Sequence, residues 1–333
     1  MYTLEKHLRD AREAYATGRL KPAIDVSDRS HGGDEPYRPI SLAEQASLER
    51  CSQYRTMALQ TTRRGNYELA HTLLATSEHY AQTSHLSPAG FLSFQSAHEA
   101  AAAYLDYREE KFESGIARIY HALAIDEKLE ETYGFVAFHA HRIRVLLNLI
   151  RLKRRQGEGL TALSMSFALM DYLEQKVALL PFPTSWDAGR LKHLSAEQKH
   201  FYFEQALTEV TFLVASQLHL PEAFLLVFEE QRHRGDARCH LSPRSHLWLQ
   251  ARQALQADDP GRFLELATPL IAAGPDTVLW LWYGILIDLV MMCEALDLEE
   301  AHLLWQDVTE DMLSWRWSGL PAAWRQALST AKE

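Results

Sequence analysis

The strongest constraint on the fold is a short pattern that recurs along the chain. A turn with a small residue is followed, two residues later, by an aromatic residue or Leu, and then by another small residue three positions on, as in Gly65, Tyr67 and Ala70. Other copies contain Gly18, Leu20 and Ala23; Phe112 and Gly115; Gly157 and Ala162; Leu220 and Ala223; Gly261 and Phe263; and Leu298 and Ala301. Between these turns nearly every segment has helical periodicity, and none shows sustained strand alternation. The sequence therefore predicts an all-α fold built from about seven helical hairpins.

Three segments carry a resemblance to a known family. GNYELA (65–70) and LDLEEA (296–301) resemble the turn and second helix of a tetratricopeptide repeat, and ALAIDE (122–127) resembles the end of that repeat. The glycine permits a tight turn, the aromatic residue or Leu fills the seam between the helices, and the alanine lets them approach. The resemblance implies a right-handed α-solenoid in which the first helix of each hairpin lines a concave surface. The first four turns are about 45–47 residues apart, against the usual ~34, which predicts longer helices or larger loops.

Two polar connections interrupt the array, at residues 28–41 and 180–194. We divide the chain at the second one. Residues 1–180 then form regular repeats with a basic inner face, residues 181–194 form a connecting loop, and residues 195–333 form divergent repeats of the same continuous array. The last segment, SGLPAAWRQALSTAKE (318–333), is expected to be a helix that caps the final repeat.

Composition narrows the functional classes. The net charge of −10 argues against non-specific binding to nucleic acid, which needs a basic surface. The three cysteines form no CxxC pair, and no signal peptide is visible, which favours a reducing compartment and hence the cytoplasm. The apolar segment Val278–Leu296 contains Asp288 near its middle, so it is expected to be a buried helix and not a membrane span.

Counting back from each turn predicts which side chains face the concave surface. The first hairpin contributes Arg9, Arg12 and Tyr15. The next three contribute Arg55, Arg63, Tyr104, Tyr107, Arg108, Arg144, Asn148, Arg151, Arg154 and Arg155. The planar fork of arginine pairs with carboxylates and phosphates, and tyrosine adds flat apolar contact.

This groove is similar to the clamp with which some tetratricopeptide domains hold acidic peptide ends, although here arginine dominates and only Asn148 supplies an amide. The leading hypothesis is a non-enzymatic adaptor or regulatory scaffold that binds an acidic peptide or partner protein and needs no cofactor. A second interpretation is that acidic neighbours such as Glu127, Glu130 and Glu131 neutralise the arginines internally. A third is that the same arginines dock nucleic acid, with a steep dependence of affinity on salt.

The alternative from a different functional class is a helical metalloenzyme. Two Glu-x-x-His spacings, Glu197 with His200 and Glu230 with His233, match the spacing of ferritin-like dimetal sites, in which residues three apart share a helix face. Both lie in polar surroundings near expected helix ends, and the further carboxylates that such a site needs are not identified. His139 and His141 are expected on opposite faces of one helix, in packing or surface roles. No P-loop, GxSxG or HExxH motif is present.

Overall fold

The structure is a computed structural model of the chain, and it describes residues 2–21, 40–177, 180, 182, 184–215, 226, 243–275 and 279–314. Within these ranges every regular element is a helix, which confirms the all-α prediction. None of the helices described there combines the length and the apolar character that crossing a bilayer requires. The apolar segment around Asp288 forms α12 (Leu279–Glu294), where Asp288 is buried and contacts Arg252. The predicted capping helix at 318–333 lies outside the described residues.

The chain forms two compact units that do not follow its linear order. One unit contains Met1–Arg29 together with Phe203–Glu333, and the other contains Ser30–Tyr202. The predicted division placed residues 1–180 together, whereas α1 (Tyr2–Gly18) packs against α11 (Pro260–Ala273) and α13 (Glu299–Ser314). Most of the segment expected to form the second helix of its hairpin, from about Leu20 to the polar connection at 28–41, lies outside the described residues.

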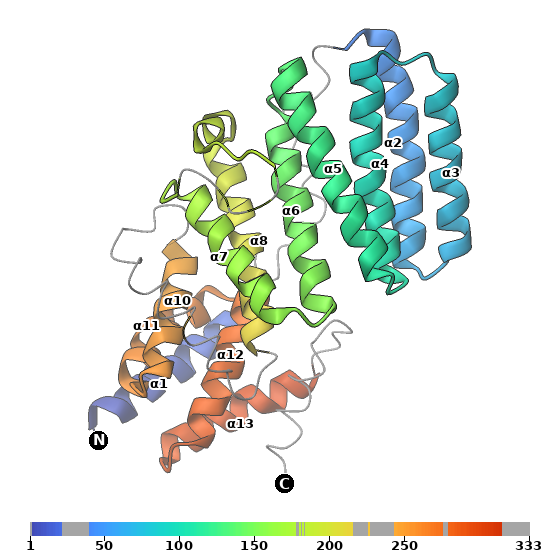
Figure 1. Cartoon of the computed structure of the whole chain (residues 1–333). Helices are drawn as coiled ribbons and strands as arrows, with labels where there is room; N and C mark the ends of the chain where they lie inside the picture. The colour runs from blue at the N-terminus through green and yellow to red at the C-terminus, as the bar shows by residue number, and fades with distance from the viewer. Residues whose placement is uncertain are drawn as a thin grey trace. The chain divides into compact units, whose positions relative to one another are not determined.

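Three consecutive helical pairs make up most of the Ser30–Tyr202 unit. The pairs are α2 (Leu42–Arg63) with α3 (Tyr67–Thr83), α4 (Pro88–Arg108) with α5 (Phe112–Tyr133), and α6 (Phe138–Arg155) with α7 (Gly159–Leu173). The first helix of the middle pair, α4, contacts both α2 and α6, and the neighbouring helices of this unit are seen side by side in Figure 1. A 3-10 helix, η1 (Ala188–His193), then packs against α7, and α8 (Ala196–Ala215) begins after it. Helices of up to 22 residues, joined within each pair by short turns, account for the long spacing of the repeated pattern.

The three turns within these pairs share one backbone conformation. Gly65, Glu110 and Gly157 occupy the same position in each turn and have φ values of 80°, 61° and 92°. The residue that follows donates its backbone N–H to the carbonyl five residues earlier, at 3.2 Å from Asn66 to Thr61, 2.9 Å from Lys111 to Asp106, and 2.9 Å from Glu158 to Lys153. Glycine adopts this left-handed conformation without steric cost, whereas a residue with a Cβ such as Glu110 pays roughly 1–2 kcal/mol. The conformation, and not the glycine itself, is therefore what repeats.

The small residue that follows each turn is buried where the two helices of a pair meet. Ala70 and Ala162 have no exposed surface. At Gly115 an added Cβ would lie 3.3 Å from the backbone oxygen of Ala103 and 3.2 Å from the side chain of Leu152. Ala103 lies on α4, so its contact is the close approach within a pair that the pattern predicts, whereas Leu152 belongs to α6 of the next pair.

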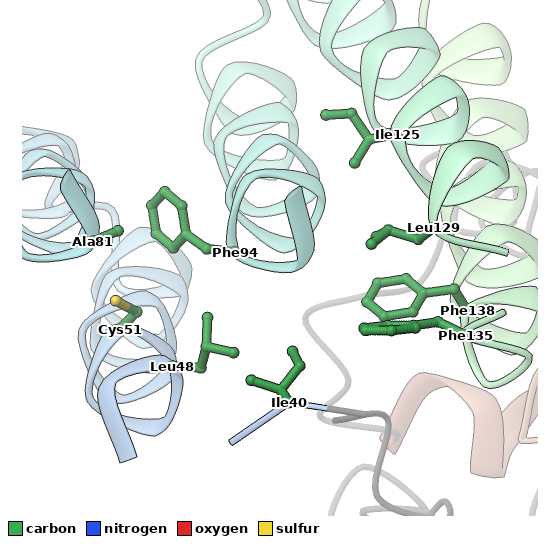
Figure 2. Close-up of a cluster of buried hydrophobic side chains, with 9 residues drawn as sticks. All are labelled: Ile40, Leu48, Cys51, Ala81, Phe94, Ile125, Leu129, Phe135 and Phe138. Carbon is green, nitrogen blue, oxygen red and sulfur yellow. The ribbon is translucent and has the colours of Figure 1, made fainter. Parts of the chain in front are cut away.

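A cluster of apolar side chains fixes the helices that carry the candidate site. Leu48 and Cys51 of α2 lie on the side of Phe94 of α4, while Leu129 of α5 and Phe138 of α6 lie near one another beyond it (Figure 2). The cluster also contains Ile40, Ala81, Ile125 and Phe135. Each of these residues is at most 6% exposed, so α2, α4, α5 and α6 share one dry core.

The other unit is held together partly by α1. An added Cβ at Gly18 would lie 2.0 Å from the backbone oxygen of Ile271, so the end of α1 touches the backbone of α11 directly. Tyr15 stacks on Trp282 of α12 with ring centroids 6.3 Å apart, and its hydroxyl donates to Asp311 at 2.7 Å. Further along α1, Arg9 contacts Glu300 at 3.2 Å. Two further contacts join this segment to α13: Arg12 of α1 reaches Asp307, and Arg19, just after α1, reaches Asp311.

These contacts correct one expectation. Arg9, Arg12 and Tyr15 were expected to face an open groove, but they face α13 and have carboxylate partners there. The physical reason is complementary charge: the acidic residues of α13 provide a partner that the local helical pattern of α1 does not show.

Candidate functional site: an arginine-lined pocket

A cavity of about 380 Å³ lies among α2, α4 and α6 of the Ser30–Tyr202 unit. Of the ten side chains expected at a binding groove, six line this one cavity: Arg55, Arg63, Tyr104, Arg144, Asn148 and Arg151. They come from three different helices, and from positions separated by up to 96 residues in the chain. The structure thus brings together most of the predicted groove residues.

Helical periodicity explains how each helix presents its share. On α6, Arg144, Asn148 and Arg151 are spaced four and three residues apart, so they share one face. The opposite side of α6 is apolar, and Leu146 and Ile150 have no exposed surface. Packing of that apolar side leaves the polar stripe to line the cavity.

Small side chains make room for a ligand. From α4, Ala97, Ala100 and Ala101 line the cavity, and α6 adds Val145. These side chains are short and leave space beside α4. The arginine side chains of α2 and α6 line the polar part of the same cavity. Its apolar side can accept aliphatic atoms at no desolvation cost.

The charge of the cavity is opposite to that of the protein as a whole. Its lining includes four arginines and His141, and among the lining residues in the described part of the chain none is Asp or Glu. Arg55 is buried and its guanidinium lies 5.8 Å from the ring centre of Phe94, whereas Arg63 and Arg144 are exposed. Arg151 donates to Asn148 Oδ1 at 3.0 Å. An array of guanidinium groups in a recess is suited to an anionic ligand.

The other four predicted residues lie outside the lining. Tyr107 stacks beside Tyr104 with ring centroids 6.1 Å apart, and the guanidinium of Arg155 lies 5.6 Å from the Tyr107 ring. Arg108 donates to the Tyr104 hydroxyl at 3.3 Å, and this hydrogen bond raises the pKa of Arg108. Arg154 is half-buried at the end of α6. Tyr107 and Arg108 therefore contact Tyr104 directly, and Arg155 contacts Tyr107.

His141 is a lining residue that the sequence interpretation missed. Its Nδ1 lies 2.8 Å from Asp126 Oδ2, and the other carboxylate oxygen of Asp126 accepts the hydroxyl of Ser96. The available signal was spacing, since His141 lies three residues before Arg144 and shares its helix face. His139, by contrast, is fully buried, with its Nε2 2.9 Å from the Tyr172 hydroxyl.

The carboxylates considered as internal neutralisers have other partners. Glu130 is buried and contacts Arg142, Arg190 and His139. Burial alone raises the pKa of Glu130, but the hydrogen bond with His139 and the charge of Arg142 hold that pKa below its usual value. Two neighbouring carboxylates on α5 also contact residues outside the pocket lining. Glu131 contacts Arg190 at 3.5 Å, and Glu127 accepts the backbone N–H of Ser185.

The metal-binding alternative falls partly outside the described residues. Glu197 and His200 lie on α8, where Glu197 is exposed, while Glu230 and His233 are not described. Across the described ranges no group of three or more His, Cys, Asp or Glu side chains is placed to hold a metal ion. The pairing of the two Glu-x-x-His motifs therefore stays an untested prediction.

Comparison with protein-family models, curated proteins and solved structures gives no match to this chain. The resemblance to tetratricopeptide repeats therefore depends on the sequence segments quoted above, and a functional assignment has to be argued from the pocket.

Proposed function

We propose that this protein is a non-enzymatic interaction protein that binds an acidic peptide segment of a partner in the pocket among α2, α4 and α6. The observation that carries the proposal is the charge of the pocket: four arginines line it, with no carboxylate among its described lining residues. An anionic segment of a partner can reach this lining, because Arg63 and Arg144 are exposed. The overall acidity of the chain favours a short anionic segment over extended nucleic acid.

The helices that carry the arginines support a preorganised site. Arg55 and Arg144 project from long helices whose opposite faces belong to the same packed unit. A site on rigid helices loses little conformational entropy when a ligand binds, so more of the contact energy appears as affinity.

The apolar part of the lining supports a peptide over a free ion. Leu59 and Tyr104 line the pocket together with the alanines of α4. These side chains offer contact to the aliphatic and backbone atoms next to an acidic side chain, which a simple inorganic anion lacks. We extend the solenoid expectation in the same way: α2, α4 and α6 would be the first helices of tetratricopeptide-like hairpins, whose inner faces hold the partner.

A photo-crosslinking experiment tests this function and identifies the partner in the same step. Thr56 is exposed and lines the pocket, so it is replaced by the photoreactive residue p-benzoylphenylalanine, and the protein is irradiated in a lysate of the source organism. Mass spectrometry of the crosslinked peptides is expected to identify an acidic segment. That segment is then synthesised, and its dissociation constant is measured by fluorescence anisotropy.

A matched pair of variants provides the control. The double variant Arg144→Glu and Arg151→Glu reverses two lining charges and is expected to weaken binding of the synthetic segment at least ~100-fold, since each lost charged hydrogen bond costs about 1.5–3 kcal/mol. Arg50→Glu with Lys128→Glu makes the same change in net charge at exposed positions outside the lining, and it should bind like the wild type. Equal weakening by both double variants, or crosslinks to neutral and basic segments, would contradict the proposal.

A further inference from the structure

The contacts of His141 bear on the identity of the anion, and this inference rests on the proposed function because it concerns the same pocket. His141 lines the cavity, and its side chain is 18% exposed. Asp126, its partner on α5, has no exposed surface. The Ser96 hydroxyl from α4 completes the group by donating to the second oxygen of Asp126.

This arrangement fixes which nitrogen of His141 carries a proton. Asp126 is an acceptor, so the imidazole donates Nδ1–H across the 2.8 Å contact. Within the described residues no hydrogen bond engages Nε2, which is the nitrogen left for a ligand in the cavity. A neutral ring therefore offers a lone pair at Nε2, whereas a protonated ring offers a second N–H donor.

The size of the cavity bears on which anionic group can bind among its arginines. A volume of about 380 Å³ is near the lower end of the ~300–1,000 Å³ typical of ligand pockets. It accommodates an anionic group together with its adjoining atoms. A single carboxylate brings one negative charge and two acceptor oxygens to this basic lining. A phosphate monoester brings about −1.5 to −2 charges and three terminal oxygens.

We propose that the pocket recognises a phosphate group carried on a side chain of the partner segment, and that His141 takes up a proton as that phosphate binds. The dianion accepts hydrogen bonds from the guanidinium groups and from Nε2–H of the protonated imidazole. Asp126 balances the added positive charge from the other side of the ring. His141 is thereby a specificity-determining residue that favours phosphate over carboxylate.

The charged groups around His141 are consistent with a proton taken up on binding. Asp126 faces it from α5, Arg144 lies one turn further along α6, and Arg55 lines the same cavity from α2. Phe138, also on α6, meets the ring edge-on with centroids 5.8 Å apart and contributes no charge. A bound dianion adds negative charge among these arginines, and this favours the imidazolium form.

Isothermal titration of small probes tests the proposal. Phenyl phosphate, benzoate and inorganic phosphate are titrated at pH 7.5, together with an acetylated five-residue peptide that carries central phosphoserine and its Glu and Ser counterparts. The phosphate-bearing organic probes are expected to bind at least tenfold more tightly than the carboxylates. Repeating the titration in buffers of different ionisation enthalpy is expected to show proton uptake on binding.

Two histidine variants assign the proton. His141→Gln retains a hydrogen-bonding group but cannot be protonated, so it should bind phenyl phosphate without proton uptake. His121→Gln is the matched control, because His121 contacts Glu99 and lies outside the lining. Proton uptake should persist in this control. Proton uptake that persists in His141→Gln would overturn the role of His141.

The remaining outcomes separate this inference from the proposed function. If the Glu peptide binds as tightly as the phosphoserine peptide, the phosphate inference is overturned while an acidic-peptide function stands. If inorganic phosphate binds as tightly as phenyl phosphate and the phosphoserine peptide, the ligand is free phosphate and the inference of a phosphorylated partner is overturned. If no anion binds and charge reversal at Arg144 and Arg151 leaves crosslinking unchanged, both proposals fail.

Discussion

Arg9 and Arg12 of α1, and Arg19 just after it, each contact a carboxylate of α13, whereas no Asp or Glu is among the described residues that line the pocket with its arginines. Arg9 and Arg12 share α1, and Arg144 and Arg151 share one face of α6, so both pairs are basic positions at helical spacing in the sequence. The difference lies in what packs opposite. In α1 the arginines contact acidic residues of another helix in the same unit, whereas in the pocket they line a recess together with small and apolar side chains.

The largest predicted effect contrasts two neighbouring arginines of α6. Arg142 has no exposed surface and contacts Glu130, Thr184 and Ser185, with its guanidinium 4.4 Å from the ring centre of Trp186. Arg142→Met removes one partner of a buried ionic network and should lower the free energy of unfolding by about 3–5 kcal/mol. Urea unfolding followed by circular dichroism measures the change.

Arg144 provides the matched comparison two residues away. It is exposed and lines the pocket, so Arg144→Met should change the free energy of unfolding by no more than about 0.5 kcal/mol. If both substitutions destabilise equally, Arg144 has a structural role, and the distinction between internally used and pocket arginines is lost.

The sequence predicted the local features and missed those that depend on distant contacts. Tyr67 and Ala70 marked a turn and a close helix pair because both are determined within one hairpin. Helical spacing correctly grouped Arg144 with Arg151 because periodicity fixes which side chains share a face. Local periodicity cannot predict whether an acidic helix packs against a basic one. For Arg12 that partner is α13, about 300 positions away in the chain.

Dependence on distant contacts also explains why the sequence did not predict His141 as a pocket residue. His141 was assigned a packing or surface role because its one sequence neighbour of interest, His139, lies on another face. Its relevant partners, Asp126 and Ser96, come from two other helices. Such a contact follows from the packing of hairpins, which the repeat pattern indicates only in outline.

The next prediction concerns the packing of α1 against α11. Gly→Ala in an uncontacted helix stabilises it by about 1 kcal/mol. At Gly18 the added Cβ would lie 2.0 Å from the backbone of Ile271, so α1 must shift away from α11. Gly18→Ala is therefore expected to lower the free energy of unfolding by about 1–3 kcal/mol. Thr17→Ala, at the exposed neighbouring position, should have little effect. A stabilising Gly18→Ala would show that α1 does not rest on α11.

A smaller effect is expected for the ion pairs of α1. Arg12 and Asp307 are 36% and 39% exposed at their side chains, so water and salt screen their attraction. A double-mutant cycle with Arg12→Gln and Asp307→Asn should give a coupling energy of about 0.5–1 kcal/mol that decreases in 1 M NaCl. A coupling of zero at low salt would remove charge pairing as the reason why α1 docks, and would leave its apolar contacts.

The smallest predicted change in stability concerns Glu44, an acidic residue on a helix that lines the pocket. It tests whether this carboxylate interacts with the pocket arginines. Glu44, in the first turn of α2, accepts hydrogen bonds from Ser87 at 2.6 Å and from Ser41 at 2.9 Å. The bonds from Ser87, and then those from Ser41, lower the pKa of Glu44 from 4.5 to about 2. Because the pKa is lower in the folded state, this stabilisation is complete above pH 4.5 and is lost as the pH falls toward 2.

Glu44→Gln should therefore cost about 0.3–0.5 kcal/mol at neutral pH, since a carboxylate near a helix N-terminus contributes about that much. The difference from the wild type should shrink as the pH falls from 4.5 to 2 in urea unfolding. Glu49→Gln, exposed on the same helix, should show no such trend. Acidic-peptide binding should be unchanged in Glu44→Gln because Glu44 connects the starts of α2 and α4 and does not line the cavity. A clear gain in peptide affinity would show instead that Glu44 competes for the pocket arginines, and the contrast with α1 would then be one of degree.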